Sequence, residues 1–292
     1  MGNTQPKNRT GKKVTAQKLE NAKKLGVLSL SEHDLDDIPT QLYSEDFRKM
    51  RTLDLSSNKL TSLGRLSVLT ELKSLNVDKN SLCAGSLSEV SKLNKLQSLS
   101  CCNNMLGMVV AAASKQVKSS PHSSSDVSLE LSLPPLPVSL KQLMLAGNRL
   151  VLFPQPVLSP TLVKLEKIDL SDNSLSEVPE AISALTGIQE LRLDRNKISH
   201  LPESMGEMKK LKVLSLKQNQ FTVKSTLFNN TSNPQPIPQV LFTETPLIDL
   251  NLHGNAMTNT QLNQFDGFQT FLERRQKVKS KTMTNLDVCG LE

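Results

Sequence analysis

The chain has 292 residues, a formal net charge of +7, 3% aromatic residues and no Trp. This composition argues against a core built on large aromatic side chains, and without a run of about 18 apolar residues the sequence predicts no transmembrane helix. Basic residues gather at the two ends, with seven against one acidic residue in 1–24 and five against one in 273–281.

The N-terminal segment, residues 1–24, has two interpretations. Gly2 follows the initiator Met, where N-myristoyl transfer requires a glycine, although the motif asks for Ser or Thr at position 6 and this chain has Pro6. A basic segment beside a lipid chain strengthens binding to an anionic membrane by about 1 kcal/mol per Lys or Arg. The segment is therefore a myristoylated, polybasic membrane anchor with a helical cap at its end, or a solvated basic tail with that cap.

One 11-residue pattern recurs along residues 25–262. In LEKIDLSDNSL, which begins at Leu165, apolar residues stand at places 1, 4, 6 and 11 and an Asn at place 9. This is the leucine-rich-repeat pattern. Places 4 and 6 alternate inward on a short strand, and places 1 and 11 close the core from either side. Nine units fit the pattern, and their first residues are Leu25, Met50, Leu72, Leu96, Leu140, Leu165, Ile188, Leu211 and Leu247.

The pattern predicts an α/β repeat fold, a leucine-rich-repeat solenoid of about nine repeats. A curved parallel β-sheet forms its concave side, and short helices or 3₁₀ turns form its convex side. Apolar-Pro pairs such as Val178-Pro179 mark where these convex passages begin, because Pro ends a strand and starts a helix. Place 9 predicts a structural ladder of side-chain amides that satisfy backbone groups between repeats. Its members are Asn58, Asn80, Asn104, Asn148, Asn173, Asn196, Asn219 and Asn255, with His33 at this place in the first repeat.

Two long steps between repeats predict inserted loops. The 44-residue step from Asn104 to Asn148 contains a Ser-rich stretch without the repeat pattern, and predicts an exposed loop over 107–137. The 36-residue step before Asn255 contains TSNPQPIPQ and predicts an extended, Pro-rich loop over 226–245. A shifted or missing repeat is the alternative for this second step.

The C-terminal segment 263–280 reads as a capping helix, and 281–292 as a tail. Phe265, Phe268, Phe271 and Leu272 recur at helical spacing. An open end of a solenoid is a sheet edge and needs such a cover.

The start MGN, the lead-in LENAKKLGVLSLSEHDLDDIP over 19–39 and the ending FDGFQTFLERR over 265–275 resemble the family of leucine-rich repeat-containing protein 57. The resemblance covers most of the chain apart from the two loops, and its end motifs are more specific than its repeats. It implies a short, intracellular, non-enzymatic protein that is anchored to lipid. Scattered cysteines and the lack of an apolar leader also predict a cytosolic protein with reduced thiols.

The sequence predicts no enzyme, because it has no metal-binding cluster, nucleophile motif or phosphate-binding loop. No cofactor or metal is expected. Places 3, 5 and 7 point outward on the concave face. We predict a partner-binding site where charge is densest and one methionine offers an apolar contact, and the alternative is a simply solvated sheet. This candidate site consists of Met144, Asp169, Arg192, Asp194, Arg195 and Lys217.

Two functional classes follow from these features. The first is a protein–protein interaction scaffold or adaptor that binds another protein on its concave face, held at the cytosolic face of a membrane through Gly2 and the basic residues. The second is a binder of nucleic acid or other acidic surfaces through its basic ends. The mixed charge of the centre and the lack of aromatic residues between the basic ones argue against nucleic acid.

Overall fold

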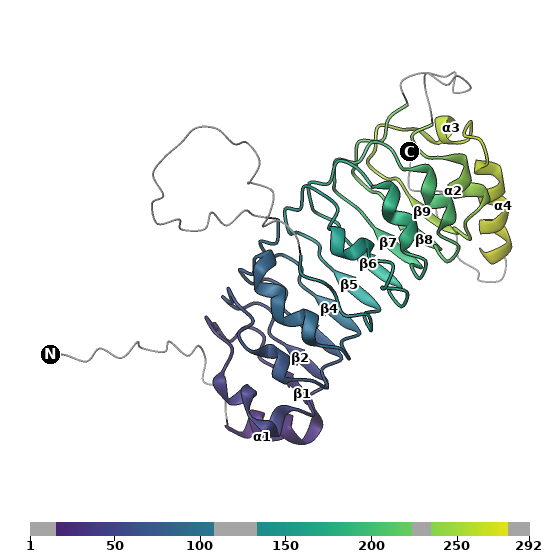
Figure 1. Ribbon diagram of the computed structural model, residues 1–292. Helices are drawn as coiled ribbons and strands as arrows, with labels where there is room; N and C mark the ends of the chain where they lie inside the picture. The colour runs from purple at the N-terminus through teal and green to yellow at the C-terminus, as the bar shows by residue number, and fades with distance from the viewer. Residues whose placement is uncertain (1–15, 108–132, 224–234, 280–292) are drawn as a thin grey trace, which may run out of the picture. The chain divides into compact units, whose positions relative to one another are not determined.

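A computed structural model describes residues 16–107, 133–223 and 235–279. The chain divides into two compact units, Met1–Pro137 and Val138–Glu292. Within each unit, short parallel strands lie side by side, and short helices cover the other side of the repeats (Figure 1). Gly2, Pro6, the tail 281–292 and most of the first predicted loop lie outside the described residues.

The first unit begins with helix α1 (Ala16–Leu25), which packs against the first strand. Its four parallel strands are β1 (Val27–Ser29), β2 (Thr52–Asp54), β3 (Ser74–Asn76) and β4 (Ser98–Ser100). The connections on the other side contain the 3₁₀ helices η1 (Thr40–Tyr43), η2 (Glu45–Phe47), η3 (Leu66–Val68) and η4 (Ala84–Lys92).

The second unit has five parallel strands, β5 (Gln142–Met144), β6 (Lys167–Asp169), β7 (Glu190–Arg192), β8 (Val213–Ser215) and β9 (Asp249–Asn251). Its short helices are η5 (Gln155–Leu158), η6 (Glu180–Ala184), η7 (Glu203–Glu207), α2 (Gln239–Thr243), α3 (Asn259–Leu262) and α4 (Phe268–Lys279). Each of η5, η6 and η7 starts directly after a proline, which presets φ for the first turn. No helix in the described part of the chain is both long and apolar enough to cross a membrane.

Alternation along each strand builds the core of both units. Places 4 and 6 are buried in all nine repeats, as Ile168 and Leu170 show, while the residues between them face outward. Place 1 is buried in every repeat except the first. The prediction that place 1 closes the core is therefore wrong for Leu25, which ends α1 and is exposed; Ala22 is buried on the same helix.

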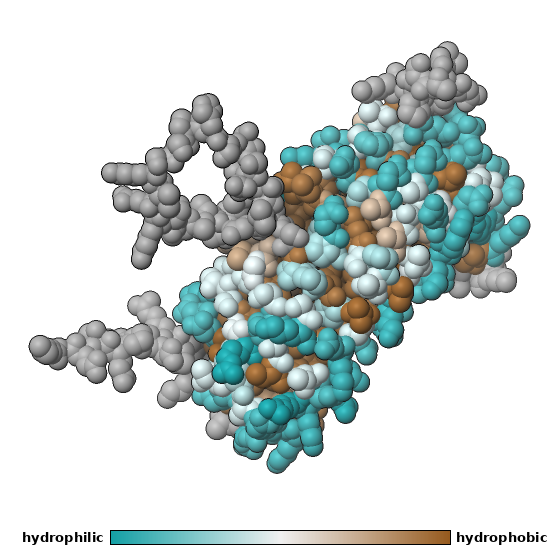
Figure 2. Space-filling model, in the orientation of Figure 1, coloured by the Kyte–Doolittle hydropathy of each residue, from teal (hydrophilic) through white to brown (hydrophobic). Residues whose placement is uncertain are grey.

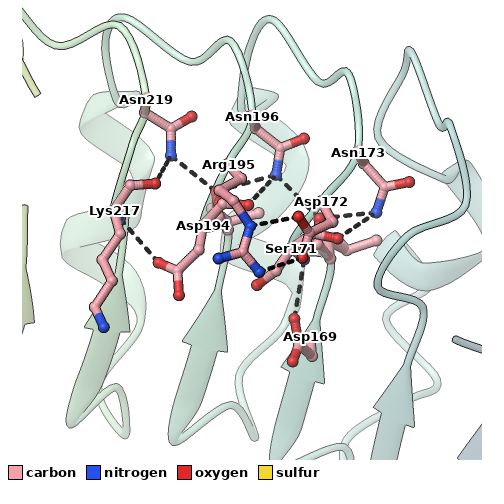
Figure 3. Close-up of polar contacts among 11 residues, drawn as sticks. Asp169, Ser171, Asp172, Asn173, Asp194, Arg195, Asn196, Lys217 and Asn219 are labelled. Carbon is pink, nitrogen blue, oxygen red and sulfur yellow. Dashed lines mark hydrogen bonds and ion pairs between the residues drawn. The ribbon is translucent and has the colours of Figure 1, made fainter. Parts of the chain in front are cut away.

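The place-9 asparagines bridge consecutive repeats through backbone groups. Asn80, for example, donates from Nδ2 to the carbonyls of Leu55 and Val77, both at 3.0 Å, and accepts at Oδ1 from the N–H of Leu60, also at 3.0 Å. In the first repeat, where His33 replaces Asn, the N–H of His33 itself donates to Asn58 Oδ1 at 3.1 Å. The row of amides in the second unit is visible in Figure 3.

The residue before each ladder position has a left-handed backbone. At place 8 the value of φ lies between 51° and 75° in all nine repeats, and only two of these residues are glycine, Gly147 and Gly254. This conformation turns the chain sharply and brings the following amide back over the carbonyls of its own strand. It is an unfavourable region for residues with a Cβ, so the bonds of the ladder must offset a local strain in seven repeats.

The structure differs from the predicted segment boundaries at three places. Residues 239–243 of the predicted loop 226–245 form α2, because Leu241 and Phe242 are buried against the repeats. The end of the predicted loop 107–137 likewise packs into the core through Leu133. The capping segment 263–280 is interrupted by Gly267 at φ +79°, and its helix α4 starts only at Phe268.

Candidate functional site

The six predicted contact residues all lie in the second unit, on or directly after β5 to β8. Parallel register pairs Met144 with Asp169, Asp169 with Arg192, and Arg192 with Ser215. Places 3, 5 and 7 of these repeats therefore form rows on one side of the sheet. We call these rows, together with Arg195 at the following place 8, the strand face of the second unit. Arg192 is exposed, whereas Met144, Asp169 and the other row members named here are half-buried or buried.

Glu190 organises two of the cations on this face. Lys167 Nζ lies 3.0 Å from its Oε1, and Arg192 Nε lies 2.6 Å from the same atom. Partial burial alone would raise the pKa of Glu190, but the hydrogen bonds from Lys167 and Arg192 outweigh it and hold the pKa below its usual value. The guanidinium of Arg192 is thus held in place while 46% of its side chain stays exposed.

Arg195 makes a second ion pair, with Asp172 of the preceding repeat. Its Nε donates to Asp172 Oδ1 and its Nη2 donates to Oδ2 at 2.5 Å, so the pair is bidentate (Figure 3). Both residues occupy place 8, where φ is 55° and 52°, and this shared turn puts the two side chains opposite each other. The hydrogen bond from Arg195 lowers the pKa of Asp172, and the pKa of Arg195 is raised in return.

The Asp172–Arg195 pair should make a small contribution to stability that depends on pH. Because the pKa of folded Asp172 lies below its usual 3.8, the contribution is present above that value and disappears as pH falls through the folded pKa. Both side chains are about half exposed, so we expect Arg195→Gln to cost about 0.5 kcal/mol near pH 7 and less near pH 2. Urea unfolding at the two pH values measures the difference. Lys197→Gln, at the next cation along the chain, is the control. A loss of stability in Arg195→Gln that is as large in acid as at pH 7 contradicts the prediction.

Asp194 serves the neighbouring repeat. Its Oδ1 accepts from Ser215 Oγ at 2.5 Å and from the N–H of Lys217 at 2.8 Å. In the first unit, Asp78 makes the same two bonds to the next repeat, from Ser100 Oγ at 2.7 Å and from a backbone N–H at 2.6 Å. Asp194 is therefore engaged in holding two repeats together, which makes it a poor position for testing contacts by mutation.

Sequence reasoning missed the two carboxylates that orient the arginines, Asp172 and Glu190. A signal existed for both. Asp172 stands at place 8, and the next repeat has Arg195 at place 8. Glu190 stands at place 3, and the preceding repeat has Lys167 at place 3. For Asp194 the signal was an Asp at place 7 followed by a Ser at place 5 of the next repeat.

Among residues 16–107, 133–223 and 235–279, no group of three or more His, Cys, Asp or Glu side chains could hold a metal ion.

The strand face of the second unit is a set of paired and half-buried charges with two exposed guanidinium groups. Such a face is suited to polar contacts with another macromolecule. Lys217 and Asp169 have no ion pair within 4.0 Å among the described residues, so their charges are available beside Arg192 and Arg195.

Comparison with known families supports the repeat assignment. The family model described as "Leucine rich repeat" matches residues 138–198, which include β5, β6 and β7. The fold is a leucine-rich-repeat solenoid. This confirms the predicted fold class of parallel strands and short 3₁₀ connections. A comparison with curated proteins gave no match.

Solved structures with leucine-rich repeats share this fold at low sequence identity. An internalin, InlF, of Listeria monocytogenes has a TM-score of 0.58 and 20% identity over 85% of this chain and 61% of its own. Internalin C2 of the same organism has a TM-score of 0.53 and 19% identity over 76% of this chain and 80% of its own. A chain of the LRIM1/APL1C complex has a TM-score of 0.54 and 22% identity over 82% of this chain and 36% of its own. The chain thus spans less than two thirds of InlF and of the LRIM1/APL1C chain.

Proposed function

We propose that this leucine-rich-repeat protein is a non-catalytic scaffold or adaptor that binds another protein on the strand face of its second unit. The observation that carries the proposal is the pair of exposed guanidinium groups of Arg192 and Arg195, each held by a carboxylate. Arginine is enriched among residues that dominate binding energy. A side chain that is already oriented loses less conformational freedom when a partner binds, so more of its contact energy appears as affinity.

The comparisons support a binding role for the fold. One similar structure is described as a complex, LRIM1/APL1C, so a chain of this architecture occurs in an assembly of proteins. At 22% identity the likeness extends to the fold, and the contacts of that complex are not transferred to this chain. The proposed partner of this chain is a protein whose surface offers carboxylates to Arg192 and Arg195 and a cation to Asp169.

We further propose that the protein works at the cytosolic face of a membrane, to which Gly2 and the basic N-terminal residues attach it. An acyl chain by itself binds membranes weakly, and the positive charge supplies the second attraction. The intact mass of the protein made in a eukaryotic cell, compared with the Gly2→Ala variant, tests the acylation separately from the scaffold function.

Reversing the charge of Arg192, Arg195 and the half-buried Lys217 should abolish the proposed interaction. We expect Arg192→Glu/Arg195→Glu/Lys217→Glu to weaken partner binding about 100-fold, because each reversal turns an attraction into a repulsion at the interface. Quantitative affinity purification from cells, at equal expression of variant and wild type, measures the loss of particular proteins.

A matched control has the same change in net charge away from the strand face. Lys164, Lys197 and Lys210 are exposed cations of the second unit outside the three rows, and their triple reversal to Glu should leave the partner list intact. A partner list that is the same for the wild type and for both triple variants would rule out the strand face of the second unit as the binding site. Circular dichroism of the purified variants excludes loss of folding as the cause.

A further inference from the structure

Leu25 is the exception among the place-1 residues. The others have 1% exposure or less: Met50, Leu72, Leu96, Leu140, Leu165, Ile188, Leu211 and Leu247. Leu25 is 73% exposed. Helix α1 runs into the first repeat and ends there, with the N–H of Gly26 bonded to the carbonyl of Ala22 at 2.8 Å. Ala22 is buried instead, and the leucine side chain is turned outward.

Val27, two residues further on, is a second large apolar side chain at this end. It opens β1, the first strand of the unit, and is 51% exposed. Leu25 and Val27 therefore flank the buried Gly26 on the surface. Apolar surface interrupts the hydrophilic side chains near α1 and β1 in Figure 2. Together the two side chains offer an apolar contact at this end of the unit.

Basic residues border this apolar pair. A Cβ on Gly26 would lie 3.1 Å from the carbonyl oxygen of Lys49 and 3.9 Å from Cγ of Arg51, so both residues border the pair. The N–H of Lys73 bonds to the carbonyl of Arg51 at 2.8 Å and continues the row, and Lys24 precedes Leu25 in sequence. We call Leu25, Val27 and these four cations the basic apolar end of the first unit.

The four cations give this end an excess of positive charge. Lys24, Lys49, Arg51 and Lys73 are exposed and have no ion pair among the described residues. The carboxylates nearby make ion pairs with other cations: Lys23 pairs with Glu20 and Asp46 at 2.9 and 3.0 Å, and Lys95 pairs with Glu71 at 2.5 Å. Lys73 and Arg51 also lie near enough to Glu71 to help Lys95 lower the pKa of that carboxylate, without an ion pair to it. An occupant of this surface must therefore supply negative charge around an apolar centre.

We propose that the basic apolar end docks on an anionic membrane surface, with Leu25 and Val27 entering the headgroup region and Lys24, Lys49, Arg51 and Lys73 contacting lipid phosphates. Anionic lipid matches both halves of the surface, since it presents phosphate charge directly above hydrocarbon. The inference adds a docking surface of the folded repeats to the proposed membrane attachment. It requires neither acylation of Gly2 nor a partner on the second unit.

The test is co-sedimentation of the full-length Gly2→Ala protein with lipid vesicles. The substitution removes any contribution of the acyl chain. Vesicles of phosphatidylcholine with about 30% phosphatidylserine should bind the protein, and pure phosphatidylcholine should bind it weakly. We expect Leu25→Ser to lower the partition coefficient about ten-fold, because a leucine side chain leaves the interface. Arg51→Glu/Lys73→Glu should lower it at least about 25-fold, since each basic residue contributes roughly a factor of five.

Matched variants of the second unit serve as controls. Leu152→Ser removes a leucine that is 67% exposed, and Lys141→Glu/Lys212→Glu reverses two exposed lysines at the same repeat place as Arg51 and Lys73. Both should bind like the parent protein. The proposal is wrong if the parent protein does not sediment with anionic vesicles, or if the control variants lose as much binding as those of the basic apolar end. If the protein does not bind vesicles, the occupant of this surface is instead a protein with acidic residues around an apolar segment. The proposed scaffold function is not affected by that result.

Discussion

Replacing Asn173 by alanine should lower the free energy of unfolding by about 4 kcal/mol, because it leaves two buried N–H groups without their acceptor. Asn173 Oδ1 accepts from the N–H of Asn148 at 3.1 Å and from that of Leu150 at 2.9 Å. Its Nδ2 also donates to the carbonyl of Leu145 at 3.0 Å and to the carbonyl of Leu170, in its own repeat, at 2.9 Å. With its bond to Ser171, the amide makes five hydrogen bonds, three to the preceding repeat and two within its own.

The lost acceptor matters more than the lost donor in this variant. The carbonyls keep other donors, since Leu170 also accepts from Asn196 and Ser171 from the N–H of Gly147. A backbone N–H has a single proton, and burial keeps water from replacing the acceptor. We therefore expect Asn173→Asp, which keeps the acceptor oxygens, to be destabilised through its buried charge and lost donors by an amount that shrinks as the pH is lowered.

Urea unfolding followed by circular dichroism measures these differences. Asn94→Ala, at an exposed asparagine outside the ladder, is the matched control and should change stability by less than about 0.5 kcal/mol. If Asn173→Ala unfolds at the same urea concentration as Asn94→Ala, the ladder does not hold the repeats together.

Phe271→Ala should cost about 3–5 kcal/mol, comparable with losing the ladder asparagine. Phe271 is fully buried on α4, with its ring centroid 5.5 Å from that of Phe268 and 6.0 Å from that of Phe242 on α2. Arg274 ties the same helix down by donating to the carbonyls of Leu247 at 2.9 Å and Phe242 at 2.7 Å. Truncation would open a cavity in this cluster and loosen the helix that covers the last repeat.

Loss of this cover should also promote association, because a loosened C-terminal cap exposes apolar surface next to the final strand β9. Differential scanning calorimetry gives the stability change, and light scattering below the melting temperature detects association. Phe271→Leu keeps most of the volume and should cost less than about 1.5 kcal/mol. Equal effects of the leucine and alanine variants would mean that Phe271 acts through its ring shape rather than by filling the core.

The repeats could be predicted from sequence because each one uses local information. Ile168 and Leu170 are buried because they alternate on a strand, and the Asn at place 9 reaches groups whose position is set by the same 11-residue pattern in the next repeat. Every repeat contacts its neighbours in the same way, so one period predicts the geometry of all of them. The predicted fold class depended on nothing more distant, and the structural comparisons confirm it.

The features that escaped sequence reasoning depend on what stands beside a residue rather than on its place in the pattern. Leu25 has the apolar identity of place 1, but α1 delivers Ala22 to the core and turns Leu25 to the surface. Residues 239–243 have a Pro-rich approach that indicates a loop, yet Leu241 and Phe242 find a buried site and the segment becomes a helix. The partnership of Asp172 with Arg195 required both the left-handed turn at place 8 and the distance between repeats. These exceptions depend on neighbours in space, so only the tertiary structure decided them, whereas the period of leucine and asparagine sufficed to determine the repeat and its buried places.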